Sequence, residues 1–307
     1  GIGERQGVVR AKVGMVNDIP VYEAKALAAL PQFMNCLTFC NQALLRIHKQ
    51  MPREVRYVAD VRRWILTHAA LFLHFQHRVD PSAPPLTATN LYSLVEQSSM
   101  VSPNTVTSYL KEIQNFGYIE AIPSQDGRVR AYKMSAFSEQ MFHVYLSVNL
   151  QALDQIDGTG RSEVTRTTPE ILNYMHPVFA GLMLRDSFLS APPQSIAQLV
   201  STTVGISILN EMTRSVIASP ADGVERIEIA LDSASAMAQR YGVSRGNVAR
   251  LLKKVELEND FGKTGKAGWI SARLVRDYHQ WQACKFAHVS TAYVEACRQY
   301  DMACAVA

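Results

Sequence analysis

Two twelve-residue segments of this chain, starting at Ser102 and Ser244, resemble each other at an offset of 142 residues. They read SPNTVTSYLKEI and SRGNVARLLKKV, and the serine, valine, leucine, lysine and final apolar positions coincide. In each segment the serine is a good helix N-cap, and the apolar residues that follow have helical spacing. A repeated helix in similar surroundings predicts a duplicated structural unit, and this constrains the fold more than any other feature.

The residues around the first segment predict a compact succession of short elements. We expect a short helix at 89–97, a second helix at 103–116 and two strands at 118–122 and 128–134. A tight turn at Gln125-Asp126-Gly127 joins the two strands. Helix, turn, helix and two-stranded ribbon is the element order of a winged helix.

The residues around the second segment predict the same plan. A short strand at 224–231 precedes helices at 233–241 and 245–258. The Gly-rich segment 262–268 would form the tip of a wing, and Trp269-Ile270 its return strand.

The rest of the chain has the pattern of long helices, which we expect at 21–50, 58–76, 137–156, 169–189, 196–218 and 272–300. The predicted fold is therefore mostly α with small β-wings, with two winged helix-turn-helix units in tandem joined by long scaffold helices. The predicted divisions are an N-terminal helical extension at 1–57, a first winged unit with its flanking helix at 58–156, a linker at 157–168, and a second winged unit with flanking helices at 169–307.

Steric logic supports a helix-turn-helix in the second unit. Ala238 falls where the two helices approach, Gly242 where the first helix needs a left-handed residue to end, and Val248 and Leu251 where the second helix meets the core. On these residues the sequence resembles the helix-turn-helix superfamily of bacterial transcription regulators, and its overall plan is similar to the MarR family. The resemblance implies two winged units paired through long flanking helices, and double-stranded DNA as partner.

The outer face of the second helix is basic, with no acidic residue before Glu256. Guanidinium and amide groups there could read base edges in a major groove, while the lysines attract phosphates. The candidate DNA-binding residues of this unit are Arg240, Ser244, Arg245, Asn247, Arg250, Lys253 and Lys254, with Lys263 and Lys266 in the wing.

The first unit departs from this pattern, because Glu96 and Met100 stand where the second unit has Ala238 and Gly242. Its turn must therefore have a different geometry, and its outer face is polar but hardly basic. The candidates are Asn104, Thr105, Thr107, Ser108 and Lys111 on the helix and Arg128, Arg130 and Lys133 in the wing. The alternative in both units is a plain three-helix core with a solvated polar face, or a protein-binding module.

Composition excludes several classes of protein. With 48% hydrophobic and 19% charged residues the chain can fold throughout, and the net charge of +4 is only mildly basic. Five cysteines without framework spacing favour a reducing cytoplasm. Two uncharged stretches, 26–45 and 187–210, contain prolines and amides that argue against a membrane span, and no signal peptide is expected.

We find no constellation that predicts catalysis, a metal or a cofactor. His68, His74 and His77 do not share one helix face, and Cys36 and Cys40 are expected to be ordinary buried thiols. Phosphate-loop, dinucleotide and nucleophile-elbow motifs are absent from the sequence. The protein is therefore not expected to be an enzyme.

The predicted function is sequence-specific binding of double-stranded DNA by a transcriptional regulator, with one chain acting as a pseudo-dimer. A plasmid-type replication initiator and a winged-helix protein-interaction adaptor are the alternatives. A small-molecule effector and a second copy of the chain are further partners that the sequence allows, whereas a membrane is not expected as a partner.

Overall fold

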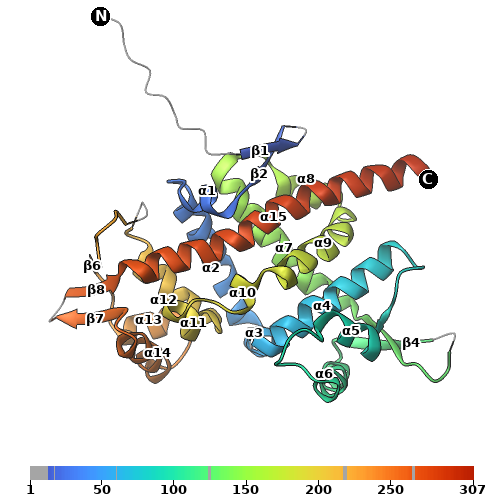
Figure 1. Cartoon of the computed structure of the whole chain (residues 1–307), viewed down its shortest axis with the longest axis horizontal. Helices are drawn as coiled ribbons and strands as arrows, with labels where there is room; N and C mark the ends of the chain where they lie inside the picture. The colour runs from blue at the N-terminus through green and yellow to red at the C-terminus, as the bar shows by residue number, and fades with distance from the viewer. Residues whose placement is uncertain (1–12, 17, 60, 124–125, 217–219, 265–266) are drawn as a thin grey trace, which may run out of the picture.

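The structure is a computed structural model that describes residues 13–16, 18–59, 61–123, 126–216, 220–264 and 267–307 (Figure 1). The described part of the chain is mostly helical and carries two small three-stranded antiparallel sheets, which confirms the predicted fold class at that level. In this part of the chain, no helix combines the length and the apolar character that crossing a bilayer requires.

The N-terminal region begins with a β-hairpin that the sequence did not predict. Its strands pair from Val13 opposite Tyr22 to Val16 opposite Ile19. Three helices follow, and Pro31 separates the first two, as expected from its missing N–H. The elements are β1 (Val13–Val16), β2 (Ile19–Tyr22), α1 (Ala24–Ala28), α2 (Phe33–Gln50) and α3 (Pro52–Ala59).

The first repeat has a leading helix, a strand, two short helices, a hairpin and a long closing helix. Its sheet has the order β3-β5-β4, so the strand before the helices pairs with the last strand of the hairpin. The last strand of the hairpin is shorter than the strand predicted at 128–134, because it begins only at Ala131. The elements are α4 (Val61–Val79), β3 (Leu86–Thr87), α5 (Ala88–Val95), α6 (Pro103–Asn115), β4 (Ile119–Ile122), β5 (Ala131–Met134) and α7 (Ala136–Asp157).

The second repeat follows the same sequence of elements, and its sheet has the matching order β6-β8-β7. The closing helix α15 is 35 residues long and extends from this sheet to the C-terminus (Figure 1). The elements are α12 (Thr203–Thr213), β6 (Arg226–Ile229), α13 (Ala234–Tyr241), α14 (Arg245–Leu257), β7 (Phe261–Thr264), β8 (Ala267–Ser271) and α15 (Ala272–Val306).

Four helices connect the two repeats. The segment predicted as a linker at 157–168 contains the first of them, and the single helix predicted at 196–218 is in fact two helices that separate at 201–202. The elements are α8 (Arg161–Thr167), α9 (Ile171–Arg185), α10 (Ser187–Ser190) and α11 (Gln194–Val200).

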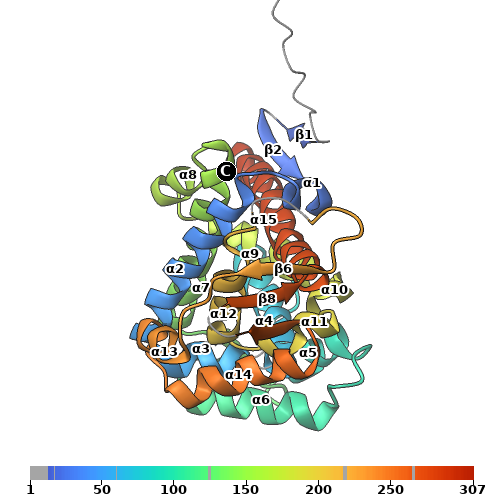
Figure 2. The same ribbon diagram turned by 90° about the vertical axis from the view of Figure 1, so that its left-hand side faces the viewer.

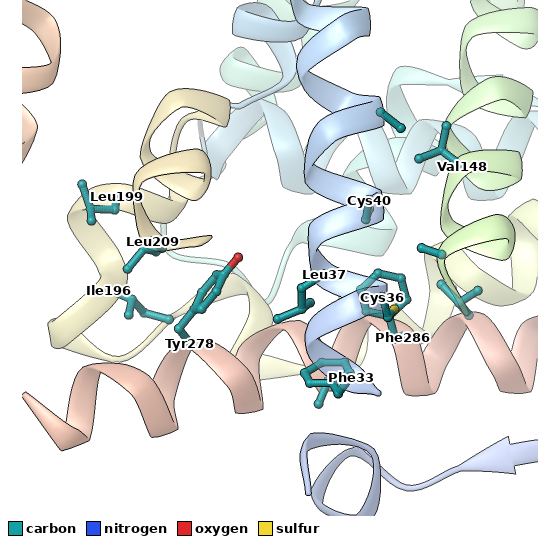
Figure 3. Packing of buried hydrophobic residues seen from close by; sticks show 14 of the residues in the cluster. Phe33, Cys36, Leu37, Cys40, Val148, Ile196, Leu199, Leu209, Tyr278 and Phe286 are labelled. Atoms are coloured by element: carbon teal, nitrogen blue, oxygen red, sulfur yellow. The ribbon is translucent and has the colours of Figure 1, made fainter. Parts of the chain in front are cut away.

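The larger of the two buried clusters is shared by elements from all along the chain. Leu37 of α2 packs in the same cluster as Val148 of α7, Leu209 of α12 and Phe286 of α15 (Figure 3). A smaller cluster fills the first repeat and includes Leu110 of α6. The predicted N-terminal extension is therefore part of the main core, because α2 lies inside it.

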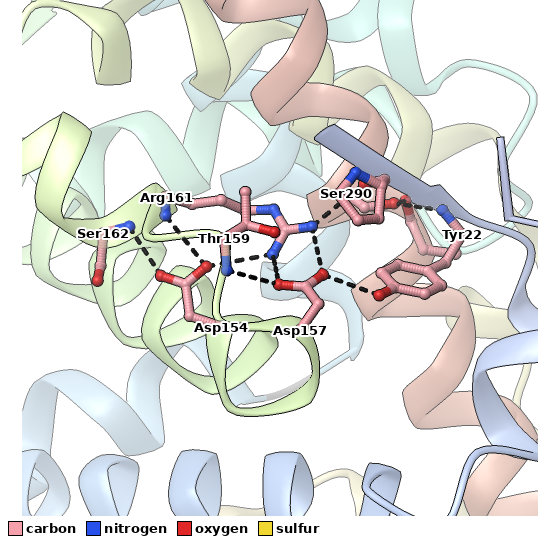
Figure 4. A network of polar contacts seen from close by, with 9 residues as sticks. Tyr22, Asp154, Asp157, Thr159, Arg161, Ser162 and Ser290 are labelled. Carbon is pink, nitrogen blue, oxygen red and sulfur yellow. Dashed lines mark hydrogen bonds and ion pairs between the residues drawn. The ribbon is translucent and has the colours of Figure 1, made fainter. Parts of the chain in front are cut away.

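A buried arginine ties the predicted linker to this core (Figure 4). The Arg161 side chain has no exposed surface and donates to Asp154 at 3.1 Å and to both carboxylate oxygens of Asp157 at 2.9 Å. It also donates to the Pro20 carbonyl, and the Tyr22 hydroxyl donates to Asp157 at 2.8 Å. Burial alone would raise the pKa of Asp157, but these hydrogen bonds and the charge of Arg161 outweigh it and hold that pKa below its usual range.

Candidate nucleic-acid interface

The turn between α13 and α14 has the geometry that the sequence predicts. Gly242 ends α13 in the left-handed conformation with φ of 68°. The Ser244 hydroxyl accepts a hydrogen bond from the backbone N–H of Asn247 at 3.1 Å and so caps α14. Ala238, Val248 and Leu251 are all buried. One side of α14 is therefore fixed in the core, and its other side faces outward.

The outward side of α14 is accessible to a partner. Arg245, Arg250 and Lys253 are exposed, and Asn247 and Lys254 are half-buried. Arg250 donates to the Asn247 side-chain oxygen at 3.0 Å, which holds the two groups together near the start of the helix. Arg245 has no ion pair within the described residues. The protein's own scaffold thus leaves this basic face open.

Arg240 is placed differently from the other candidates. Its guanidinium pairs with Asp232 at 2.7 Å and with Glu211 at 2.8 Å. Because two carboxylates already neutralise its charge, Arg240 offers a phosphate less than Arg245 does. Its contacts instead join α13 to the leading helix α12.

The hairpin of the second repeat carries one candidate within the described residues. Lys263 is exposed on β7, whereas Lys266 lies outside the described residues. The hairpin is held at its base by Trp269, whose ring lies 3.8 Å below the Arg226 guanidinium. Lys263 therefore projects from a hairpin with a well-packed base.

Helix α6 of the first repeat begins with a serine N-cap, as α14 does. Ser102 caps it by accepting from the Thr105 amide at 3.2 Å, and Val106, Leu110 and Ile113 are buried. Its exposed candidates are Asn104, Thr107, Ser108 and Lys111, and Thr105 is half-buried.

The first turn differs from the second, as the sequence predicts. Glu96, which follows α5, is right-handed, whereas Gly242 is left-handed. In the adjoining hairpin, Arg128 and Arg130 are exposed, and Lys133 lies 3.9 Å from Glu120 on the neighbouring strand. The charge of Lys133 is therefore partly balanced.

Helices α6 and α14 lie along the same edge of the molecule. Both stand at the lower edge in Figure 1 and again in the perpendicular view of Figure 2. One extended partner could therefore meet both helices.

Sequence patterns did not identify Lys49 as a neighbour of this interface. Its side chain lies 3.7 Å from the Cβ position of Gly242, so the end of α2 adds a cation beside the turn. No local signal could have shown this, because the two residues are far apart in sequence.

The structure also places the histidines and cysteines that the sequence offered as possible metal ligands or catalytic groups. No group of three or more His, Cys, Asp or Glu within the described residues is placed to hold a metal ion. Cys36 and Cys40 are buried as predicted, and burial raises the pKa of both thiols. His74 bridges Glu139 at 2.6 Å and the Met134 amide at 3.1 Å, and so fastens α4 to α7 and β5.

The chain matches no family model, no curated protein sequence and no solved structure. Its function is therefore inferred from its own residues and their geometry.

Proposed function

We propose that this protein binds double-stranded DNA sequence-specifically through two winged helix-turn-helix units of one chain and acts as a transcriptional regulator. The observation that carries the proposal is the face of α14, where Arg245 and Arg250 are exposed and Arg250 donates to the half-buried Asn247. Val248 and Leu251 anchor the opposite side of the same helix in the core.

The chemistry of this face suits a major groove. A helix of 13 residues is about 20 Å long, and a B-DNA major groove accepts a helix. Arginine pairs with guanine and asparagine with adenine through two hydrogen bonds each, while Lys253 and Lys254 would attract phosphates. Lys263 in the adjoining hairpin extends the positive surface toward a neighbouring groove.

The duplication supports a pseudo-dimer. The two repeats share their element order and sheet order, and α6 and α14 lie along one edge. Two such helices on one edge can enter successive grooves of a duplex. Because the α6 face is polar and the α14 face basic, the preferred site would be asymmetric.

A second candidate, a protein-interaction adaptor, is favoured by one feature of the first repeat. Leu94 and Met100, which flank its turn, are 39% and 44% exposed. Exposed apolar side chains around a polar helix suit a protein contact better than a phosphate backbone. In that case α14 would bind DNA while the first repeat recruits a partner, or neither repeat would bind DNA.

The proposal is tested by selecting bound duplexes from a random pool of DNA sequences. The affinity of the protein for the selected sequence is then measured over a series of salt concentrations. We expect Arg245→Ala with Arg250→Ala to weaken binding at least tenfold and to reduce the slope of log K against log salt by about 1 to 2. The control is Arg166→Ala with Arg298→Ala, which removes two exposed arginines elsewhere. Equal salt slopes for the two double variants, or no selected sequence, would rule out the proposal.

Genome-wide mapping of the bound sites separates regulation from replication initiation. A regulator is expected at scattered promoters. Sites confined to repeated arrays beside an origin would instead identify an initiator.

A further inference from the structure

A cavity of about 470 Å³ lies between the leading helices of the two repeats. Residues from α4 and α12 face it from the two repeats, and residues from α2, α3, α7, α9, α10, α11 and α15 also line it. Its lining is mainly apolar and includes Trp64, Phe179, Met183 and Trp281. The volume is in the range of about 300 to 1,000 Å³ that is typical of small-molecule sites.

The lining of this cavity includes a buried cation that has no counter-ion among the described residues. Lys285 is only 8% exposed, and its Nζ lies 3.7 Å from Cys40 Sγ and 4.4 Å from the centre of the Phe286 ring. Among the described residues that line the cavity, none is an aspartate or a glutamate. The Cys40 thiol stays neutral because burial raises its pKa. A buried ammonium with only neutral neighbours is costly, and an anion beside it would offset that cost.

Two neighbours on α15 offer further unused polar groups. Gln282 is 5% exposed and lines the cavity. Its Oε1 has no hydrogen-bond partner among the described residues, while its Nε2 lies 3.4 Å from the Tyr278 hydroxyl. If the amide is turned by 180°, Oε1 can accept from Tyr278 and Nε2 is free to donate to a ligand. Trp281 also lines the cavity, and its Nε1 has no partner. Buried polar groups almost always have a hydrogen-bond partner. The Trp281 N–H and the Gln282 Nε2 of the turned amide therefore point to a missing acceptor.

We propose that this cavity binds an apolar monocarboxylate. The carboxylate would accept from Lys285 and Gln282, and the hydrocarbon body would lie against Trp64, Phe179 and Met183. A fatty acid and an aromatic acid share this chemistry, and a series of ligands can distinguish them. The inference does not depend on whether the protein binds DNA.

Calorimetric titration with octanoate, decanoate and dodecanoate, each below its micelle concentration, tests the proposal directly. Each added methylene is worth about 0.8 kcal/mol when buried, so we expect affinity to rise about fourfold per methylene until the cavity is full. Benzoate and naphthoate serve as the aromatic arm, and tighter binding than that of decanoate would assign the aromatic class. Decanol has the same chain as decanoate without the charge and is expected to bind at least tenfold more weakly.

Variants at Lys285 test the head group. Lys285→Met should weaken decanoate at least tenfold and leave decanol unchanged, while Lys285→Arg retains binding. Lys25→Met, which removes an exposed lysine, is the matched control. Removing a buried unpaired charge should not harm folding, and thermal unfolding checks this. If Lys285→Met does not fold, the affinities of the unaltered protein for decanoate and for decanol decide whether the head group needs a charge.

Tryptophan fluorescence gives a second readout, since two of the three tryptophans line the cavity. In a Trp269→Phe background only Trp64 and Trp281 remain, and saturating decanoate should change their emission. The proposal is overturned if no acid binds at millimolar concentration, if decanol binds as tightly as decanoate, or if Lys285→Met binds decanoate like the unaltered protein.

Discussion

The indole of Trp269 occupies the space that a side chain at Gly262 would need, since a Cβ built there would lie 2.4 Å from Trp269 Nε1. The two residues are opposite each other in the β7–β8 pair, and Arg226 stacks on the same indole. We therefore expect Gly262→Ala to displace the ring and lower the free energy of unfolding by about 1 to 3 kcal/mol. In the other hairpin, a Cβ built at Gly127 lies more than 4 Å from every other described residue that is not its chain neighbour, so Gly127→Ala should change the stability little. Unfolding both variants in denaturant compares their stabilities. Equal midpoints would contradict the predicted difference between Gly262→Ala and Gly127→Ala.

If α6 faces DNA, adding positive charge to it should strengthen binding. Ser108 is exposed, and the neighbouring Lys111 gives this face its one basic group among the candidates of the helix. We expect Ser108→Arg to increase affinity several-fold at low salt and to steepen the salt slope by about 1. Ser187→Arg, on α10 in the connecting region, is the control for the added charge. No difference between the two variants would mean that α6 does not lie against the duplex.

Removing the buried cation at residue 161 should strongly destabilise the protein. Arg161→Met leaves Asp154 and Asp157 as two nearly buried carboxylates without their partner. Breaking a buried ion pair from one side costs about 3 to 5 kcal/mol. The free energy of unfolding in urea measures this loss at neutral pH. Arg166→Ala, which breaks the solvent-exposed pair between Arg166 and Glu163, should lower the free energy of unfolding far less.

Two buried histidines predict acid sensitivity. Burial lowers the pKa of His68 and of His279 to about 4, whereas an unfolded histidine has a pKa near about 6.5. Between these two pH values both histidines bind a proton in the unfolded chain, whereas in the folded protein they stay neutral. Stability should therefore be complete above pH about 6.5 and fall toward pH about 4, by up to about 1.4 kcal/mol per pH unit for each histidine.

His279→Phe isolates one contribution to this slope. The ring packs edge-on to Phe33, and the His279 Nε2 atom has no hydrogen-bond partner, so a phenyl ring can replace it. Unfolding free energies at several pH values should show a shallower decline for the variant. An unchanged slope would mean that His279 titrates normally.

Local signals in the sequence were sufficient to predict how α6 and α14 begin and how α13 ends. Ser102 and Ser244 cap their helices, and Gly242 ends α13, because each role depends on neighbours within a few residues. Burial of Val248 and Leu251 followed from helical spacing alone.

Features that depend on distant contacts could not be predicted in this way. Lys285 lies between Cys284 and Phe286 in the sequence, and nothing local shows that its ammonium packs beside Cys40 of the distant helix α2. Arg161 lies in a Gly-, Ser- and Thr-rich segment that is typical of a linker, although Asp154, Asp157 and the Pro20 carbonyl surround its side chain. The cavity likewise exists only where several distant helices meet.

The place of α2 inside the main core has a consequence for how this protein could have diversified. Leu37 and Cys36 lie outside both repeats in the sequence, yet they share one interior with residues of α7, α12 and α15. A half of the chain cannot be transplanted, deleted or exchanged without opening that interior to water. If α6 and α14 bind DNA as proposed, evolution would therefore have altered their specificity by surface substitution on these helices, rather than by shuffling whole modules.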